Sequence, residues 1–232
     1  DREDFIRIFD EVCSRGAYIM QKELQDFEEE IASYCNVKYA IGVGNATDAL
    51  EMAFYLTGIN KGDEVILPSH TMTATPSSAY LHGGVPIFVD VDEEGFMDVE
   101  LIEEKITEKT KYIVPVQLNG RTSKMENILR ISEQYDIKII EDSAQGLGSK
   151  YKDKQAGTFG IAGVFSFYPA KVLGTLGDGG MLITNDTNLA EKAKYYRDHG
   201  RNGLECEIWG RNSRLDNIHA AFLSFQFKSF EK

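Results

Sequence analysis

Hydrophobic residues in the first part of the chain recur at three- and four-residue steps. This spacing places them on one face of a helix and predicts two opening helices within a helical segment of about residues 1–36. Gly16 lies between the two sets, so we expect the first helix to end there. The residues of the two faces are Phe5, Ile6, Ile8, Phe9 and Val12, followed by Leu24, Phe27, Ile31 and Tyr34.

From residue 39 onward, short apolar runs alternate with longer amphipathic stretches. The short runs predict strands at residues 39–43, 64–67, 86–91, 112–116, 137–140, 161–167 and 180–184. The amphipathic stretches predict helices at residues 46–57, 74–82, 99–106, 124–135, 189–198 and 216–227. Repeated strand–helix units are typical of α/β proteins, so we expect a three-layer αβα fold with a mostly parallel sheet.

The 232 residues show neither an internal repeat nor a linker, so we expect one large domain over residues 1–232. Hydrophobic residues make up 42% of the chain, which is enough to bury a full core. The sequence has no starting methionine and ends within a helix-like stretch. Both features suggest a piece of a longer protein.

The net charge of −12 and the pI near 4.8 argue against binding to nucleic acid or to an anionic membrane, because both need a basic face. No apolar run is long enough to span a bilayer. The four histidines do not have the spacing of a metal site. The three cysteines are odd in number and widely spaced, which favours reduced thiols and a cytoplasmic location.

Lys171 lies among apolar residues, glycines and small hydroxyls, and Asp178 is the only other residue with a full charge between Phe159 and Asn185. Burial among apolar groups disfavours the ammonium form of a lysine, and a neutral amine can attack a carbonyl to form a Schiff base. The alternative is a lysine on a surface loop, because glycine-rich turns are common on surfaces.

Ligands of parallel sheets bind beyond the carboxyl ends of the strands, where we expect residues 44–47, 69–75 and 142–145 to meet. Residues 44–47 join a strand to a helix, and their small size would let the first helical amides hold a phosphate. The alternative is a helix without a ligand, capped by Asn45 or Thr47.

Asp142 directly follows a buried-type strand, so its carboxylate is expected to face the same crevice. It could bind a protonated heterocyclic nitrogen through a charge-assisted hydrogen bond, or simply cap a helix. Gln145 is close enough to share the site, whereas Glu141 points to the opposite face and is expected to be structural. Asn212 and Arg214 could reach an anion or cap the last helix.

Seven segments, at residues 44–50, 67–71, 86–92, 141–145, 166–171, 177–180 and 212–216, follow one another in the order and spacing of a known family. Together they resemble the DegT/DnrJ/EryC1/StrS sugar aminotransferases, fold-type-I enzymes that use pyridoxal phosphate. The resemblance covers nearly the whole chain. It implies that residues 1–232 form the large cofactor-binding domain and that the family's small C-terminal domain is absent.

The resemblance also implies roles for individual residues. Lys171 resembles the catalytic lysine that forms the Schiff base, Asp142 the partner of the ring nitrogen, and Gln145 a residue near the phenolic oxygen of the cofactor. Three positions resemble phosphate contacts: Ala46, Thr47 and Ser166. Asn212 resembles a residue that reaches the phosphate of the neighbouring subunit, which implies a homodimer with shared active sites.

Two positions depart from the family pattern. Met72 stands where family members stack an aromatic ring on the cofactor, so a softer thioether contact is expected. Asn45 stands where the family often has serine or glycine, and it remains small and polar.

The activity implied by the resemblance is transfer of an amino group from an amino acid, glutamate, to the keto group of a nucleotide-linked sugar. Biosynthesis of a surface polysaccharide or of an antibiotic sugar would fit. One alternative is a dehydratase on the same scaffold, but those relatives replace the lysine by histidine. Another is a regulator that binds the cofactor without catalysis. A dinucleotide-dependent oxidoreductase would need a glycine fingerprint that the chain lacks.

Overall fold

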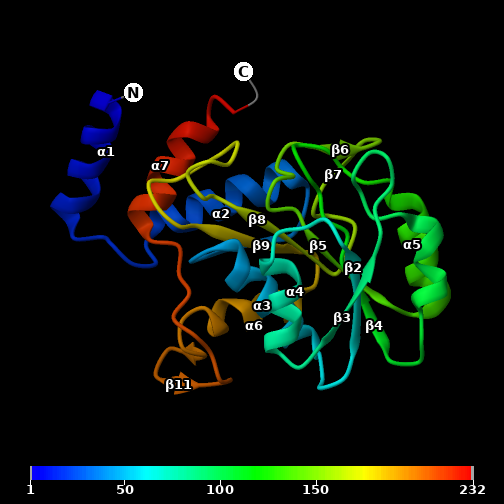
Figure 1. Ribbon diagram of the computed structural model, residues 1–232. Coiled ribbons are helices and arrows are strands. Elements are labelled where there is room, and N and C mark those ends of the chain that lie inside the picture. Colours follow the sequence, from blue (N-terminus) through cyan, green and yellow to red (C-terminus); the bar gives the residue numbers. More distant parts are fainter. Residues whose placement is uncertain (1, 231–232) are drawn as a thin grey trace.

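The computed structural model describes residues 2–230, which contain a seven-stranded sheet in the order β1-β9-β8-β5-β4-β2-β3, with helices on both faces (Figure 1). The strand β9 is antiparallel to its neighbours β1 and β8, and the other pairs are parallel. The α/β class predicted from the sequence is confirmed. The strands are β1 (Tyr39–Val43), β2 (Glu64–Pro68), β3 (Val85–Val89), β4 (Thr110–Ile113), β5 (Lys138–Asp142), β8 (Ala162–Ser166) and β9 (Gly180–Thr184).

Helices form a layer on each face of the sheet. The first layer holds α3 (Ala46–Thr57), α4 (Ala74–Leu81) and α6 (Thr187–Tyr196). The second holds α2 (Lys22–Cys35), α7 (Asn217–Phe227) and α5 (Met125–Tyr135). The first helix, α1 (Arg2–Arg15), packs on α7 at one end of the molecule, and α5 lies at the other end (Figure 1).

Four segments differ from the sequence-based prediction. The helix expected at residues 99–106 is two short 3₁₀ turns, η1 (Val99–Leu101) and η2 (Glu103–Lys105), in which the amides of Ile102 and Ile106 bond carbonyls three residues back. The strand expected at 112–116 ends at Ile113, and the nearby Pro115 has no N–H with which to continue the ladder. Two small hairpins were not predicted: β6 (Lys150–Tyr151) with β7 (Lys154–Gln155), and β10 (Arg201–Asn202) with β11 (Glu205–Cys206).

Neighbouring residues of β5 point to opposite faces of the sheet. Ile140 packs in the core beneath α3, whereas Ile139 packs in the core beneath α5. By the same alternation Asp142 lies on the side of α3 and α4, and Glu141 lies on the other side. The strand therefore delivers two adjacent acids to two different environments.

Within residues 2–230, no helix combines the length and the apolar character that a bilayer crossing requires. The three cysteines, Cys13, Cys35 and Cys206, form no disulfide with one another. Burial raises the pKa of the Cys35 thiol to about 12, so this thiol is unreactive.

Candidate active site

A cavity of about 700 Å³ lies at the carboxyl ends of the parallel strands. The loops that follow β1, β2, β4, β5 and β8 form its wall, because parallel strands all end at this edge of the sheet. The wall contains seven of the residues singled out from the sequence: Ala46, Thr47, Met72, Asp142, Gln145, Ser166 and Lys171. Residues separated by more than a hundred positions in the sequence thus meet in one place.

The N-terminus of α3 lies at this cavity. Asn45 caps the helix, because its Oδ1 accepts a hydrogen bond from the amide of Asp48 at 2.8 Å. The amides of Ala46 and Thr47 are at the first two helical positions, which have no acceptor within the helix. A Cβ on Gly180 would lie 2.5 Å from the amide nitrogen of Ala46, so only glycine lets β9 begin this close to the helix. The exposed amides and the helix dipole form a site for an anion.

Asp142 is the buried acid of the cavity, with 4% of its surface exposed. Its Oδ2 accepts a hydrogen bond from Thr75 Oγ1 at 2.6 Å, and its Oδ1 accepts one from the amide of Ala144 at 3.1 Å. Burial raises the pKa of Asp142, while these two hydrogen bonds and the charge of Lys171 act in the opposite direction. Such a carboxylate is stabilised further by any cationic N–H that enters the cavity.

Lys171 is half-buried on the loop after β8. Its backbone amide donates a hydrogen bond to the carbonyl of Tyr168 at 2.8 Å, which closes a tight turn. Among the described residues that line the cavity, Lys171 is the only one with a cationic side chain. The interpretation as an ordinary surface-loop lysine is therefore disfavoured, because the side chain lines the same cavity as the buried Asp142.

A hydrogen bond to its oxygen orients the side-chain amide of Gln145. Its Oε1 accepts a hydrogen bond from the amide of Asn119 at 3.0 Å, so the NH₂ group is the end that can donate into the cavity. Similarly, Ser166 Oγ accepts the amide of Tyr168 at 3.3 Å and keeps its hydroxyl proton for another acceptor. Both side chains are thus oriented as donors.

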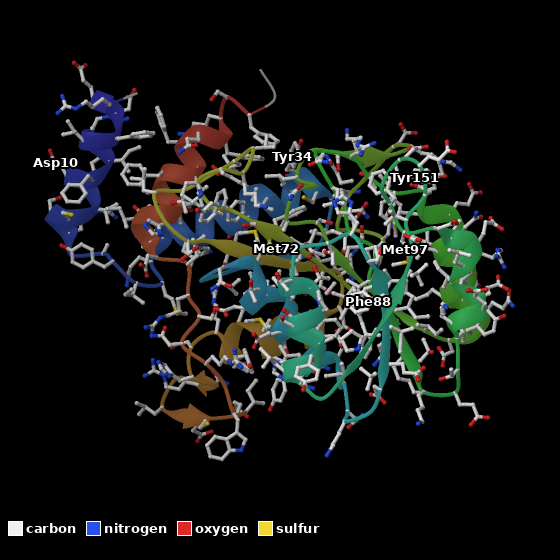
Figure 2. All side chains as sticks on the ribbon, viewed as in Figure 1. Asp10, Tyr34, Met72, Phe88, Met97 and Tyr151 are labelled. Carbon is white, nitrogen blue, oxygen red and sulfur yellow. The ribbon has the colours of Figure 1, made fainter. Side chains whose placement is uncertain are left out.

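Met72 lies on the rim of the cavity with 70% of its surface exposed. Figure 2 shows its side chain near the middle of the molecule, beside α4. A flexible thioether in this position can pack against the face of a planar ligand.

Asn212 and Arg214 lie outside the cavity, and Asn212 is on an exposed part of the segment before α7. Its neighbour Ser213 holds this segment in place. Ser213 Oγ donates to Asp48 Oδ2 at 2.6 Å and accepts the amide of Gly44 at 3.1 Å. Arg214 instead donates to Asp198 Oδ1 at 2.7 Å, which favours a structural role over anion binding.

Glu141 has the structural role expected from its position. It is fully buried, and its two carboxylate oxygens accept hydrogen bonds from the side chain of Gln117 and from three backbone amides of the loop before β8, those of Gly157, Phe159 and Gly160. Burial raises its pKa, although these donors favour the charged form. Glu141 thus fixes the loop on the side of the sheet away from the cavity.

Sequence analysis missed Thr75. The segment 69–75 was expected at the crevice, but no residue in it besides Met72 was singled out. A threonine at the start of a helix is normally interpreted as a capping residue, so the local sequence gave no indication that this hydroxyl contacts an acid 67 positions away.

The chain matches known proteins over its whole length. A model described as the DegT/DnrJ/EryC1/StrS aminotransferase family matches residues 1–232. The chain is 41% identical to a "Pleiotropic regulatory protein" of Geobacillus stearothermophilus over 100% of this chain and 63% of the relative. It is 39% identical to the dTDP-3-amino-3,4,6-trideoxy-alpha-D-glucose transaminase of Streptomyces venezuelae, over 91% of this chain and 56% of the relative.

Among solved structures, the crystal structure of DesV from S. venezuelae in complex with a ketimine intermediate superposes with a TM-score of 0.95 at 36% identity. The match covers 99% of this chain and 62% of that one. The chain thus spans about three fifths of the length of these proteins.

Proposed function

The chain belongs to the DegT/DnrJ/EryC1/StrS aminotransferase family, and on that basis we propose that it acts in a pyridoxal-phosphate-dependent sugar aminotransferase. The enzyme would transfer an amino group from an amino acid, glutamate, to the keto group of a nucleotide-linked sugar. The observation that carries the proposal is that Lys171 and the buried Asp142 share one cavity with the N-terminus of α3. Residues 1–232 would form the cofactor-binding domain.

The residues of the cavity fit the three reactive parts of pyridoxal phosphate. The amides of Ala46 and Thr47, together with the hydroxyl of Ser166, suit a phosphate. The carboxylate of Asp142 suits a protonated ring nitrogen, and Lys171 supplies the amine that the aldehyde needs. Burial raises the pKa of Asp142 even with the charge of Lys171 nearby, so a protonated ring nitrogen would add a further partner that favours the carboxylate.

Two further side chains would hold the ring in place. The NH₂ group of Gln145 would donate a hydrogen bond to the phenolic oxygen, because its Oε1 is already held by Asn119. Met72 would pack against the ring face from the rim of the cavity.

When bound, pyridoxal phosphate supplies an aldehyde that condenses with amines and a protonated ring that withdraws electrons from the adjacent carbon. Lys171 would then move the proton at the α-carbon of the amino donor, acting as base and later as acid. Asp142 would keep the ring nitrogen protonated throughout. Both tasks need groups held inside an enclosed space, where charge interactions are strong.

Lys171 supports amino transfer over the dehydratase alternative. The resemblance noted above places histidine at this position in the dehydratases. A regulator could hold the cofactor with the same lysine and acid, so only turnover separates it from an aminotransferase. Because the Geobacillus relative is named a regulatory protein, the experiment must also distinguish a regulator from an enzyme.

Asn212 supports a homodimer with shared sites. It is exposed, outside its own cavity, and the neighbouring Ser213 fixes its backbone against α3. A residue held rigidly at the surface can serve a site on a second copy of the chain. A cytoplasmic location would agree with the unpaired cysteines.

The decisive experiment follows the visible absorbance of the protein loaded with pyridoxal phosphate. Glutamate should abolish the visible band, and a panel of dTDP-, UDP- and GDP-linked ketosugars should restore it only where an aminated sugar is found by mass spectrometry. A band that persists in glutamate would show binding without transfer and would favour the regulator.

A further inference from the structure

Two threonine hydroxyls form a chain that ends on Asp142. Thr75 Oγ1 lies 2.6 Å from Asp142 Oδ2, and Thr71 Oγ1 lies 2.7 Å from Thr75 Oγ1. Thr75 and Asp142 are almost wholly buried, at 0% and 4% exposure, and Thr71 is half-buried. Water is therefore largely excluded as an alternative partner for the two buried groups.

The charge on Asp142 fixes the direction of every hydrogen bond in this chain. An ionised carboxylate can only accept, so Thr75 must donate to it. With its own proton committed, Thr75 can accept a hydrogen bond only, and Thr71 must donate to Thr75. The amide of Ala144 donates to the other carboxylate oxygen. Protonation of Asp142 would allow both hydroxyls to reverse.

The position of Thr75 adds a second electrostatic contribution. Thr75 is the second residue of α4 (Ala74–Leu81), so its side chain brings Asp142 to the N-terminal turn of that helix. The partial positive charge of this turn favours a carboxylate. Met72 belongs to the same segment and faces the cavity. One segment therefore does two things: through Thr75 it donates a hydrogen bond to Asp142, and through Met72 it lines the cavity.

We propose that Thr75 is a positioning residue that keeps Asp142 ionised and aimed at the ring nitrogen of the cofactor, with Thr71 as the second donor of the chain. The proposal rests on the proposed function, in which Asp142 binds that nitrogen. One hydroxyl and one amide bond the carboxylate directly, and Thr71 supports that hydroxyl from the next position of the chain. Each carboxylate oxygen keeps a lone pair for a cation in the cavity.

The test compares Thr75→Val, which removes the hydroxyl at nearly constant shape, with Thr75→Ser, which keeps it. Two ligands are titrated into the cofactor-free protein: pyridoxal phosphate, and its analogue with C–H in place of the ring nitrogen. Thr110→Val is the matched control, because Thr110 is a buried threonine whose hydroxyl also bonds a carboxylate, that of Glu64 at 3.1 Å, at the start of β4.

Thr75→Val should lower the affinity for pyridoxal phosphate by about tenfold or more, which is the usual effect of losing a hydrogen bond to a charged group. The affinity for the analogue should equal that of the wild type. Thr75→Ser should restore most of the affinity, Thr71→Val should show a smaller loss of the same kind, and Thr110→Val should show none. A ¹³C NMR titration of the Asp142 carboxyl in the cofactor-free protein should give a higher pKa in Thr75→Val than in wild type.

Equal losses for the two ligands in Thr75→Val would overturn the positioning role, since they would reveal only a damaged pocket. Wild-type affinity in Thr71→Val would overturn the two-hydroxyl chain. Failure of the proposed function itself would be seen in the wild-type protein. If it bound neither ligand, or bound both equally, Asp142 would have no contact with the ring nitrogen.

Discussion

The charge of Lys171 lowers the pKa of Asp142 although the two residues come from the ends of different strands, β8 and β5. The amine and the acid therefore lie near each other in one cavity, where opposite charges stabilise each other. Removal of the Lys171 charge should therefore raise the pKa of Asp142 further. The predictions below separate the contributions of these and neighbouring groups.

Replacing the lysine removes the amine that bonds the cofactor. Lys171→Ala should lose the visible absorbance of the loaded protein and reduce turnover to background. Borohydride reduction followed by peptide mass mapping should attach the cofactor to Lys171 in wild type only. The exposed Lys194→Ala serves as the control and should behave as wild type. Turnover that survives in Lys171→Ala would refute the assignment.

Asp142→Asn should stabilise the cofactor-free protein at neutral pH, because burial raises the pKa of Asp142 and makes its ionised form costly. The folded protein holds this proton more tightly than the unfolded chain does. Wild-type stability should therefore fall as the pH rises above the ordinary value of 3.8 toward the raised one. The hydroxyls of Thr75 and Thr71 can reverse to accept the new NH₂ group.

The difference in melting temperature between Asp142→Asn and wild type should be smallest near pH 3.8 and grow with increasing pH. Thermal melts across that range measure it. With cofactor bound the order should reverse, and amino transfer should slow by orders of magnitude, because asparagine cannot hold the ring nitrogen protonated. A difference that does not vary with pH would contradict the buried-charge account.

Glu141→Gln should destabilise the fold and leave the cavity chemistry intact. The new NH₂ group would face N–H donors at either end: those of Phe159 and Gly160 in the place of Oε1, or those of Gln117 and Gly157 in the place of Oε2. The unpaired donors should lower the free energy of unfolding by about 2–4 kcal/mol, measured by urea denaturation. The exposed Glu133→Gln should change it by less than about 0.5 kcal/mol. Equal stability of the two variants would show that Glu141 is dispensable.

Asn45 should stabilise the fold as the N-cap of α3, and its neutral side chain should avoid repelling a phosphate bound there. Asn45→Ala should cost about 1 kcal/mol of stability by removing the acceptor for the amide of Asp48. Asn45→Asp should keep the cap but lower the affinity for pyridoxal phosphate by about fivefold, because a new negative charge would face the phosphate. Pyridoxal without its phosphate is the control ligand and should bind both Asn45→Asp and wild type alike. A similar loss with pyridoxal would exclude a phosphate at this helix end.

Asn212→Ala should speed loss of the cofactor from a dimer without changing the monomer fold, measured by dissociation kinetics and sedimentation. Mixing this variant with Lys171→Ala gives a stricter test. In a mixed dimer with shared sites, both defects fall in one site and the other site is intact. Random mixing should thus restore about one quarter of all sites. No recovery, or a monomer with full cofactor affinity, would rule out sharing.

Local sequence patterns predicted most elements well. The predicted ranges 39–43 and 46–57 coincide with β1 and α3, because β-branched and small residues form the strand and Gly58 ends the helix with a positive φ of 88°. The segment 99–106 shows the limit of this reasoning. Its apolar spacing is helical, yet the buried Ile102 is held between two short 3₁₀ turns.

The direction of β9 lay beyond local prediction. The apolar run at residues 180–184 predicts a buried strand but not whether that strand is parallel or antiparallel to its neighbours. The direction is fixed by its pairing with β1 and β8, which is antiparallel in both cases. The close approach of Gly180 to the start of α3 depends on that direction, because it brings the first residue of β9 to the edge where the cavity lies.

The sequence by itself determined which chemical groups are available and where they lie: Lys171 in the loop after one strand, Asp142 at the carboxyl end of another, and a small-residue turn before α3. Only the tertiary structure decided how these groups are held. It set Thr75 against Asp142, turned the NH₂ end of Gln145 toward the cavity, and left Asn212 outside it. The physical reason is that periodicity and capping act between near neighbours in the chain, whereas the orientation of a buried polar group depends on partners brought to it by folding.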